Sequence, residues 1–337
     1  MRFGTWLGPH PAREATAVLA CSQARFRAAR VSSARAQLLL AKLGTADGAP
    51  AVKALVLGAG GQVGRALLAS VPKGVDVDPL PHRVLDIADT EGIEFVLDRL
   101  GPALVINAAG YTGVERAEFE RERAFAINGE GVKHLSLACA RRHVRLVHIS
   151  TDHVFDGKAS RPYRTDAHCS PINFYGFSKL AGELAVAGHE CALVVRTSRI
   201  YSSHGRNYVG SMLARMAQQR NVHAVHDQIA APTSARCLAR YLWRAALCKE
   251  ITGVRHWTDA GEASWYEWAC AIRSEGLALG LLRSAPHPAP VASNDCPTAA
   301  RRPSYTVLET GTSARELDFE PLPWRTGLRA VLMELNR

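Results

Sequence analysis

The sequence predicts an α/β fold, a Rossmann-type doubly wound parallel sheet with a smaller C-terminal substrate-binding cap. Two observations lead to this prediction. Short apolar segments alternate with helical segments from residue 53 to about 195, which is typical of a parallel sheet covered on both faces. A glycine-rich segment directly follows the first apolar segment, where dinucleotide-binding folds place their phosphate loop. We therefore expect ligands at the carboxyl ends of the strands.

The elements of the first half follow this alternation in order, and residues 53–195 form the predicted NAD(P)-binding domain. The predicted strands are Ala54–Leu57, Val75–Val77, Ala103–Ile106, Leu146–Ile149 and Cys191–Val195. The predicted helices are Gln62–Ser70, the long stretch Glu115–Arg141, and Asn173–Ala187.

Beyond residue 196 the alternation fades. Helices are expected at Tyr208–Arg220, Pro232–Cys248 and Ser264–Leu277. We expect residues 196–335 to form mainly the cap, with some segments returning to the Rossmann sheet. The aromatic side chains of this part are expected to fill the core of the cap, and they are Trp257, Trp265, Tyr266 and Trp268.

Composition and charge exclude several classes of protein. A chain of 337 residues with 47% hydrophobic residues can bury a large core, and no apolar run approaches the roughly 20 residues that cross a bilayer. Half of the net charge of +10 comes from residues 1–50, so a dense nucleic-acid-binding surface is not expected. Residues 1–50 are rich in Arg, Ala and Ser, and we expect a leader or transit segment outside the core fold. The eight dispersed cysteines suit reduced thiols in a cytoplasmic protein.

The glycine-rich segment spans residues 58–64 and matches G-x-x-G-x-x-G rather than G-x-G-x-x-G. Glycines at these positions allow a tight turn and a close approach of the backbone to a pyrophosphate, which then faces a helix N-terminus. The predicted cofactor contacts in this segment are Gly58, Gly61, Gln62, Val63 and Gly64.

The end of the second strand bears on the choice of cofactor. Asp78 has the spacing of the acid that binds the 2′-hydroxyl of NADH, but Pro79-Leu80-Pro81 follows it. If the strand continues to Pro81, the acid is missing and His82 or Arg83 can meet the 2′-phosphate of NADPH. We therefore expect NADPH, with use of NADH left open.

Tyr175 and Lys179 form a Tyr-x-x-x-Lys pair, and Thr151 ends the fourth strand. Residues four apart lie on one helix face, so the ammonium group can lie beside the phenol. We expect this cation to lower the pKa of the tyrosine and make it a usable acid. Together with a dinucleotide-binding loop, the pair predicts hydride transfer to a carbonyl.

Six ordered blocks of the chain resemble the dTDP-4-dehydrorhamnose reductase family of extended short-chain dehydrogenase/reductases. The resemblance covers about Lys53 to Leu335. The blocks are Asn107–Glu118, His148–Gly157, Pro171–Glu183, Val195–Tyr201, Asp227–Thr233 and Arg302-Pro303.

The resemblance implies a role for each matched position. Thr151 would bind the 4-keto oxygen of the substrate, Tyr175 would donate the proton, Lys179 would hold the nicotinamide ribose, and Asn128 would support a proton-relay water. Further cofactor contacts implied are Asp86, Ile87, Ala109, Gly110, Tyr111 and Thr112. The implied substrate contacts are Thr151, Asp152, His153, Arg199, Gln228, Pro232 and Thr233.

Four positions depart from the family pattern. His153 stands where the family usually has Tyr, Arg199 where many members have Trp, Cys237 where Asp is common, and Tyr305 where Asn is common. Arg199 can bind a phosphate or a more anionic sugar nucleotide, or pair with a nearby carboxylate. The hydride-transfer residues are therefore intact while the expected sugar pocket is altered.

The function implied by the resemblance is NAD(P)H-dependent reduction of dTDP-4-dehydro-L-rhamnose to dTDP-L-rhamnose, in the cytoplasm, for polysaccharide or lipopolysaccharide precursors. Two alternatives stay open. One is a ketoreductase of another sugar nucleotide. The other is a non-catalytic NADP-binding protein that resembles the regulatory subunit of methionine adenosyltransferase.

Partners follow from the same resemblance. A sugar nucleotide is the expected ligand, no nucleic-acid or membrane partner is expected, and a homodimer is left open. Some family members use Mg²⁺, so the resemblance alone implies a metal. None of the histidines or cysteines has metal-ligand spacing, and we assign no metal site.

Overall fold

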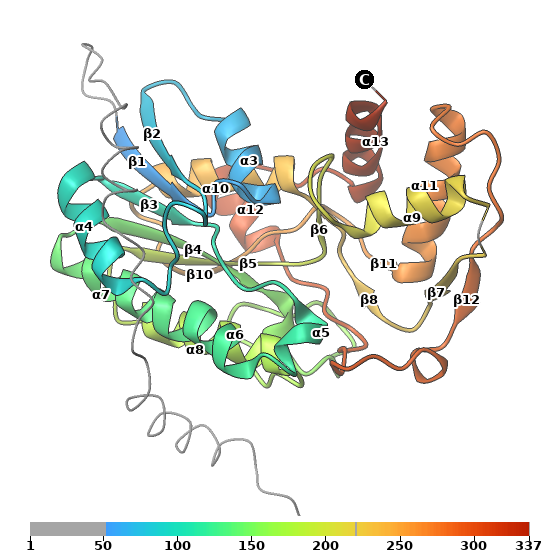
Figure 1. The fold of residues 1–337 in the computed structure, drawn as a ribbon, viewed down its shortest axis with the longest axis horizontal. Helices are drawn as coiled ribbons and strands as arrows, with labels where there is room; N and C mark the ends of the chain where they lie inside the picture. The colour runs from blue at the N-terminus through green and yellow to red at the C-terminus, as the bar shows by residue number, and fades with distance from the viewer. Residues whose placement is uncertain (1–51, 220, 337) are drawn as a thin grey trace, which may run out of the picture. The chain divides into compact units, whose positions relative to one another are not determined.

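A six-stranded parallel sheet forms the centre of the computed structural model, which describes residues 52–219 and 221–336 (Figure 1). The strands are β1 (Val52–Leu57), β2 (Val75–Leu80), β3 (Leu104–Asn107), β4 (Arg145–Thr151), β5 (Ala192–Thr197) and β10 (Gly253–His256). Their order across the sheet is β10-β5-β4-β3-β1-β2. The predicted leader, residues 1–50, lies outside the described residues.

The sheet reverses its winding direction at β1. From this strand the chain moves outward to β2 on one side and to β3, β4 and β5 on the other. The carboxyl ends of the three strands at this point are level, since Leu57 pairs with both Leu80 and Asn107. Such a switch point opens a crevice for ligands beyond the strand ends. The predicted doubly wound α/β fold is confirmed.

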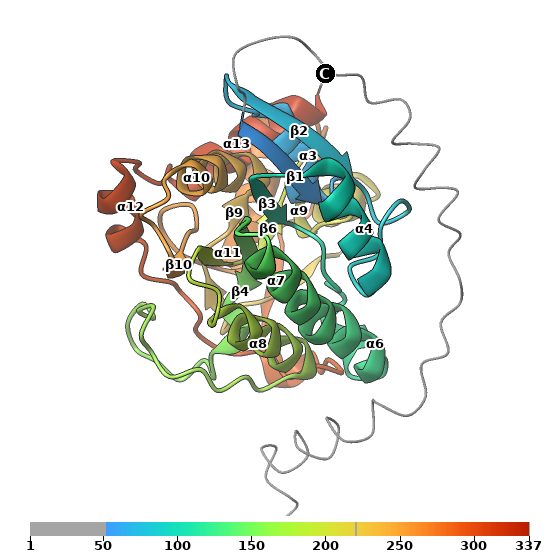
Figure 2. The same cartoon turned by 90° about the vertical axis from the view of Figure 1, so that its left-hand side faces the viewer.

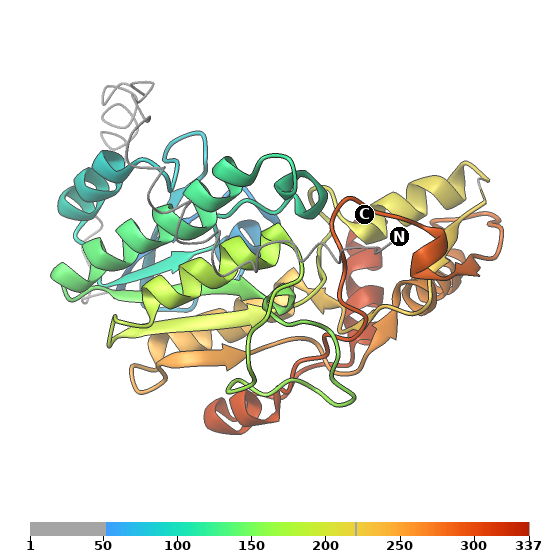
Figure 3. The same ribbon diagram turned by 90° about the horizontal axis from the view of Figure 1, so that it is seen from below.

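Helices cover both faces of the sheet (Figures 2 and 3). One face packs against α3 (Gln62–Ala69) and α10 (Ala235–Leu247), and the other against α4 (Thr90–Leu100), α7 (Val132–Arg141) and α8 (Phe174–Val186). Because side chains alternate along a strand, Val56 of β1 belongs to the first core and Leu55 to the second.

A separate apolar core forms in the C-terminal part, where Met216, Trp268 and Leu328 are buried together. The helices around it are α9 (Tyr208–Ala217), α11 (Trp265–Ala278) and α13 (Trp324–Leu335). Three short strand pairs accompany them, namely β6 (Ile200–Tyr201) with β9 (Thr233–Ser234), β8 (Ile229–Ala230) with β11 (Ala263–Ser264), and β7 (His223–Val225) with β12 (Ala289–Val291). Isolated bridges join Tyr163 to Leu308, Ile229 to Tyr305 and Ala260 to Pro323. The short helix α12 (Gly311–Leu317) packs back on the sheet.

The predicted helical stretch Glu115–Arg141 is helical over most of its length, but it is not one continuous α-helix. The structure has α5 (Val114–Ala117), α6 (Arg121–Phe125), a π-helical segment Ala126–Gly131, and then α7. The π-helical segment inserts an extra residue per turn, which re-aims side chains within it. Gly131 lies so close to the backbone that an added Cβ would be 2.7 Å from the carbonyl oxygen of Ile87.

Two elements near the sheet were not predicted. Helix α4 has Asp89 as its N-cap, whose side chain accepts a hydrogen bond from the Gly92 N–H at 3.0 Å, and Gly101 as its C-cap, with φ of 56°. Strand β10 was missed because Arg255 and His256 make it half polar. It returns to the sheet from beyond residue 196 and pairs with β5. The domain boundaries at 195 and 196 stay predictions.

Arg145 connects β4 to the end of α10. Its guanidinium donates hydrogen bonds to the carbonyl oxygens of Ala245 (3.0 Å), Cys248 (2.8 Å), Lys249 (3.2 Å) and Ile251 (2.6 Å). Carbonyl groups at a helix C-terminus lack intrahelical donors and favour a nearby cation. One arginine therefore satisfies the end of a helix that follows it by about a hundred residues in sequence.

Candidate functional site

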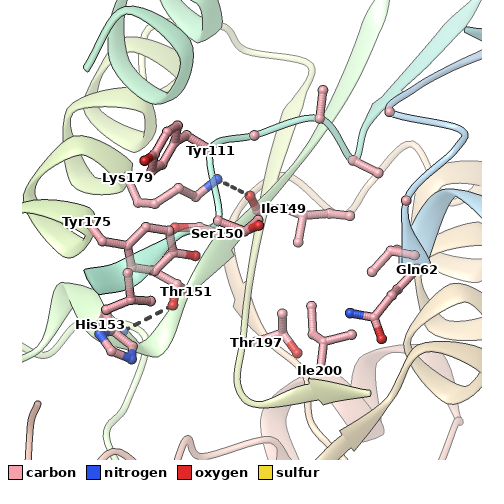
Figure 4. Close-up of a pocket in the computed structure, with 18 of the residues that line it drawn as sticks. Gln62, Tyr111, Ile149, Ser150, Thr151, His153, Tyr175, Lys179, Thr197 and Ile200 are labelled. Atoms are coloured by element: carbon pink, nitrogen blue, oxygen red, sulfur yellow. Dashed lines mark hydrogen bonds between the residues drawn. The ribbon is translucent and has the colours of Figure 1, made fainter. Parts of the chain in front are cut away.

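A cavity of about 1070 Å³ opens at the carboxyl ends of the strands and is lined by segments from both halves of the fold (Figure 4). Seven cationic side chains line it but only two carboxylates, so the cavity favours an anionic ligand. The cations are Arg65, Arg116, Arg123, Lys179, Arg199, Arg206 and Arg302, and the carboxylates are Asp86 and Asp152.

The glycine segment forms one end of the cavity. Gly58 has φ of 72°, and an added Cβ would be 2.6 Å from the backbone of Ala108 and Ala109. At Gly64 an added Cβ would be 2.3 Å from the Gly58 carbonyl oxygen. No side chain caps α3, whose N-cap is Gly61, so the first N–H groups of this helix are left for a ligand. The segment therefore fits a dinucleotide pyrophosphate.

Beside the end of β2, the cavity wall carries two basic side chains together with the carboxylate of Asp86. β2 continues to Leu80, so Asp78 lies inside the strand, where burial raises the pKa of its carboxyl. His82 and Arg65 line the cavity, whereas Arg83 is exposed and does not. Arg65 was not predicted, because a basic residue one position after the last glycine of the motif has no signal of its own in a single sequence.

Thr151 and Tyr175 meet in the cavity. Thr151 is the last residue of β4, and Tyr175 lies in the first turn of α8, which begins after the N-cap Asn173. The pKa of Tyr175 is raised to about 12, mainly by burial; a hydrogen bond with Thr151 opposes this shift and the charge of Asp152 adds to it. Tyr175 is therefore protonated at neutral pH, as a proton donor must be.

Lys179 lines the same cavity, one turn along α8 from the tyrosine. Its Nζ donates to the carbonyl oxygen of Ile149 at 2.6 Å and lies 3.3 Å from Nε2 of His148. Burial lowers the pKa of Lys179 to about 8. The prediction that this cation lowers the pKa of Tyr175 is wrong, because the ammonium turns toward Ile149 (Figure 4) and burial of the phenol dominates.

Asn128 lies behind the cavity wall, in the π-helical segment. Its Oδ1 accepts from the N–H of Tyr111 at 2.9 Å, and its Nδ2 donates to the Tyr111 carbonyl oxygen at 3.0 Å and to the Ser178 hydroxyl at 2.9 Å. This amide therefore ties the loop after β3 to α8, and its side chain does not line the cavity.

Asp152 anchors the floor of the cavity. Its Oδ2 accepts from the hydroxyls of Ser198 (2.8 Å) and Thr306 (2.5 Å), and its Oδ1 accepts from the Thr151 hydroxyl at 3.1 Å. One carboxylate thus connects the ends of β4 and β5 with a segment near the C-terminus. Thr306 was not predicted from the sequence.

His153 lies edge-on to the ring of Tyr175, with ring centres 5.5 Å apart. Its Nδ1 lies 3.0 Å from Nδ2 of Asn173, the N-cap of α8. Burial lowers the pKa of His153, and Asp152 opposes that shift. The imidazole therefore packs as a neutral ring against the proposed acid.

Arg199 has a left-handed backbone, with φ of 44°, which is strained for a residue with a side chain. Its guanidinium donates to the carbonyl oxygens of Ala263 (2.7 Å) and Gln228 (2.8 Å) and lies 4.1 Å above the Trp265 ring. Burial lowers the pKa of Arg199 to about 9. No carboxylate of the described residues forms an ion pair with it, so its charge is left for a ligand.

Several predicted residues lie beside the cavity rather than on its wall, namely Gly64, Arg83, Asn128, Pro232 and Thr233. The N–H of Thr233 donates to the carbonyl oxygen of Arg199 at 3.2 Å, so this segment supports the strained residue. The other predicted site residues line the cavity, and their roles stay predictions.

Trp265 and Arg302 were not predicted as site residues, although both line the cavity. Trp265 packs against the cap core as expected, and in addition its Nε1 donates to Oε1 of Gln228 at 3.1 Å and its ring supports Arg199. Arg302 pairs with Glu115 at 2.7 Å, so its charge is compensated. The sequence of α11 has three aromatic residues in its first turn, and the sequence alone does not show which of them faces a ligand.

The glycine segment is joined directly to the C-terminal part. Oε1 of Gln62 accepts from the Ser202 hydroxyl at 3.0 Å and from Nδ2 of Asn207 at 3.1 Å. Asn207 also caps α9, its Oδ1 accepting from the Gly210 N–H at 3.1 Å.

Neither a metal site nor a membrane span is found in the part of the chain that the structure describes. Across residues 52–219 and 221–336, no three His, Cys, Asp or Glu side chains come together in a way that could hold a metal ion. Within the same ranges, every helix is too short or too polar to cross a membrane.

Comparisons with known proteins agree on one family. Residues 52–337 match the family model described as RmlD substrate binding domain. A dTDP-4-keto-6-deoxy-D-glucose reductase of Streptomyces niveus is 38% identical, over 84% of this chain and 97% of that protein. A dTDP-4-dehydrorhamnose reductase of Aggregatibacter actinomycetemcomitans is 34% identical, over 82% of this chain and 97% of that protein.

A solved structure supports the same assignment. The dTDP-4-dehydrorhamnose reductase of Bacillus anthracis, solved in complex with NADP, is 31% identical and superposes with a TM-score of 0.79, covering 84% of this chain and 99% of that one. With a family model that spans every described element and relatives matched over nearly their whole length, this chain belongs to the RmlD family, that of the dTDP-4-dehydrorhamnose reductases.

Proposed function

We propose that this protein is an NAD(P)H-dependent reductase of the 4-keto group of a dTDP-linked 6-deoxy sugar, with dTDP-4-dehydro-L-rhamnose as the first candidate substrate. The observation that carries the proposal is the convergence of the Thr151 and Tyr175 hydroxyls in one cavity with the glycine segment. The relatives named above as reductases of dTDP-4-keto sugars supply the substrate class.

Each catalytic residue has a chemical task that its environment suits. When bound, the reduced nicotinamide supplies the hydride. Tyr175 is protonated and donates its proton to the carbonyl oxygen as negative charge develops there. The Thr151 hydroxyl, which donates its single proton to Asp152 in the structure, would turn that proton to the same oxygen and become a second donor when the substrate is bound. General acid catalysis of this kind contributes about 10²–10⁴-fold to a rate, and preorganised donors stabilise the developing alkoxide further.

NADPH is the proposed cofactor. The acid that would bind a ribose 2′-hydroxyl is missing at the end of β2, and Arg65 and His82 line the cavity on that side. A guanidinium binds a phosphate through charge-assisted hydrogen bonds. The NADP complex of the Bacillus anthracis relative agrees with this choice.

The nucleotide and sugar of the substrate would lie between β5 and the C-terminal part, against Arg199, Gln228 and Trp265. Arg199 is a charged group without a carboxylate partner among the described residues, and it would bind an anionic oxygen of the substrate. This residue also favours a second candidate, a sugar nucleotide with an acidic group on its sugar.

The decisive experiment measures oxidation of NADPH and NADH with enzymatically generated dTDP-4-dehydro-L-rhamnose. Turnover should fall by roughly 10²-fold or more in Tyr175→Phe, while NADPH binding is kept. Tyr266→Phe, on α11 and outside the cavity, is the matched control. Tight NADPH binding without turnover in the unsubstituted protein would contradict the proposal and favour another sugar nucleotide or a non-catalytic binding protein.

A further inference from the structure

Three buried polar groups form a chain behind the proposed active site. Asn107, at the end of β3, and His148, in β4, are fully buried, and Lys179 of α8 is 5% exposed. Nδ2 of Asn107 lies 3.0 Å from Nδ1 of His148, and Nε2 of the same ring lies 3.3 Å from Nζ of Lys179. His148 does not line the cavity, so it contacts Lys179 from behind.

The direction of the first hydrogen bond is set by the backbone. The N–H of Ala109 donates to Oδ1 of Asn107 at 3.1 Å, and a backbone N–H can only donate. The amide oxygen is therefore in use, and the amide nitrogen, a donor, faces His148. Nδ1 of His148 must then be the acceptor, without a proton.

The second hydrogen bond follows from the first. A neutral imidazole carries one proton, so Nε2 of His148 is the N–H and points at Lys179. Burial, together with the charge of Lys179, holds the pKa of His148 well below its usual value, so the ring is neutral. An N–H pointing at an ammonium is repulsive, whereas an N–H pointing at the lone pair of an amine is a hydrogen bond.

The opposite tautomer is disfavoured by the same atoms. If Nδ1 carried the proton, it would face the Asn107 amide nitrogen, donor against donor, at 3.0 Å. Rotating the amide would leave its nitrogen facing the N–H of Ala109 instead. Either arrangement leaves buried donors unpaired, which costs about 1–3 kcal/mol each.

We propose that Asn107 and His148 are positioning residues that fix an Nε2–H tautomer and thereby favour the neutral amine of Lys179 over its ammonium form. Lys179 still donates to the Ile149 carbonyl oxygen, so its amine is held in place. Asn107 and His148 then set how readily Lys179 gains or gives up its proton. They do so from behind the cavity wall. The inference concerns the role of Lys179 under the proposed function, but its test needs no turnover.

Other charged and titratable groups around Lys179 come from three elements. Glu183 on α8 raises the pKa of Lys179, but this carboxylate is engaged by Arg196 of β5 at 2.7 Å. Tyr175 on the same helix and Tyr111 on the loop after β3 line the same cavity as Lys179 (Figure 4). Among the residues that the structure describes, only His148 presents a ring nitrogen within hydrogen-bonding distance of Nζ.

The tautomer can be read directly by nuclear magnetic resonance. The full chain is labelled with ¹⁵N-histidine, and the His148 ring is identified by the signals lost in His148→Gln. Long-range ¹H–¹⁵N correlation should show Nε2 protonated and Nδ1 unprotonated. In Asn107→Asp the carboxylate can accept from both Ala109 and the imidazole, so the ring should change to Nδ1–H. An Nδ1–H ring in the unsubstituted protein overturns the proposal.

The effect on Lys179 is measured by competitive acetylation across pH, with peptide mass spectrometry and exposed Lys158 as internal reference. Half-maximal reactivity should lie near pH 8 in the unsubstituted protein. It should rise by at least one pH unit in Asn107→Asp and also in His148→Leu, which adds no charge. A rise confined to Asn107→Asp would reflect the new carboxylate alone and overturn the proposal, as would no rise in either variant.

Discussion

Tyr175 and Lys179 share a helix face, but burial shifts their pKa values in opposite directions. Burial keeps the phenol protonated up to about pH 12, and burial lowers the pKa of the lysine to about 8. The spacing predicted correctly that both residues lie on one helix, whereas the prediction that Lys179 lowers the pKa of Tyr175 is wrong. The sequence could not predict the environments, because the groups that surround each side chain come from β4 and from the loop after β3.

The pH dependence of the reaction should follow Lys179. Its ammonium is present below about pH 8 and is lost as the pH rises through that value. Since the ammonium would hold the cofactor ribose, we expect kcat/KM to fall above pH 8, with the slope of a single proton. Lys179→Arg keeps its charge and should lack this alkaline decline. A decline of equal midpoint in that variant would assign it to another group.

Arg65 should decide between the two cofactors. Loss of charge-assisted hydrogen bonds to a 2′-phosphate costs about 1.5–3 kcal/mol, so Arg65→Ala should raise the KM for NADPH by roughly 10-fold or more. The KM for NADH should change little. Arg83→Ala, an exposed arginine outside the cavity, is the control. Equal losses for NADPH and NADH would place Arg65 elsewhere than at the 2′-phosphate.

Strand β1, the glycine segment and α3 form the best-predicted unit of the fold. The motif required glycines, and the structure gives the reason at Gly64, where any Cβ meets the Gly58 carbonyl oxygen. The stretch 115–141 was predicted as helical, but the break between α5 and α6 and the π-helical segment were not predicted, because the apolar spacing along the stretch does not mark them. β10 could not be recognised, since an edge strand of four residues with two polar side chains has no distinct pattern.

Gly64→Ala tests this unit. The added methyl group would lie 2.3 Å from the Gly58 oxygen, so strand and helix must separate. We expect a loss of about 1–3 kcal/mol in the free energy of unfolding and weaker NADPH binding. Gly188→Ala is the matched control, because nothing lies within 4 Å of an added Cβ there. Both are compared by denaturant unfolding and by cofactor titration; equal effects would remove the packing argument.

At the scale of the whole molecule, Gln62 links the two ends of the cavity. It belongs to the glycine segment and accepts hydrogen bonds from Ser202 and Asn207, which precede α9. A dinucleotide that orders the glycine segment should therefore also order the segment of Ser202 and Asn207, against which the sugar nucleotide would bind. Such coupling is reciprocal, so each ligand must tighten the other by the same factor.

Calorimetry can measure that factor. We expect dTDP to bind several-fold more tightly when NADPH is present, and Gln62→Ala to reduce this ratio toward one while leaving dTDP affinity for the free protein unchanged. Ser211→Ala, whose exposed hydroxyl bonds only within the first turn of α9, is the control. A ratio unchanged in Gln62→Ala would mean that the two ligands communicate by another route or not at all.

The position of β10 at the edge of the sheet has a consequence for biosynthesis. During translation β5, which pairs with β4 on one side, emerges some sixty residues before β10, the strand that pairs with its other side. Until Gly253–His256 leaves the ribosome, β5 is an open edge with unpaired N–H and C=O groups. Over the same interval the Arg145 guanidinium lacks its carbonyl partners beyond α10. The nascent chain therefore cannot complete its nucleotide-binding sheet early, and a chaperone that shields β5 would act in this interval.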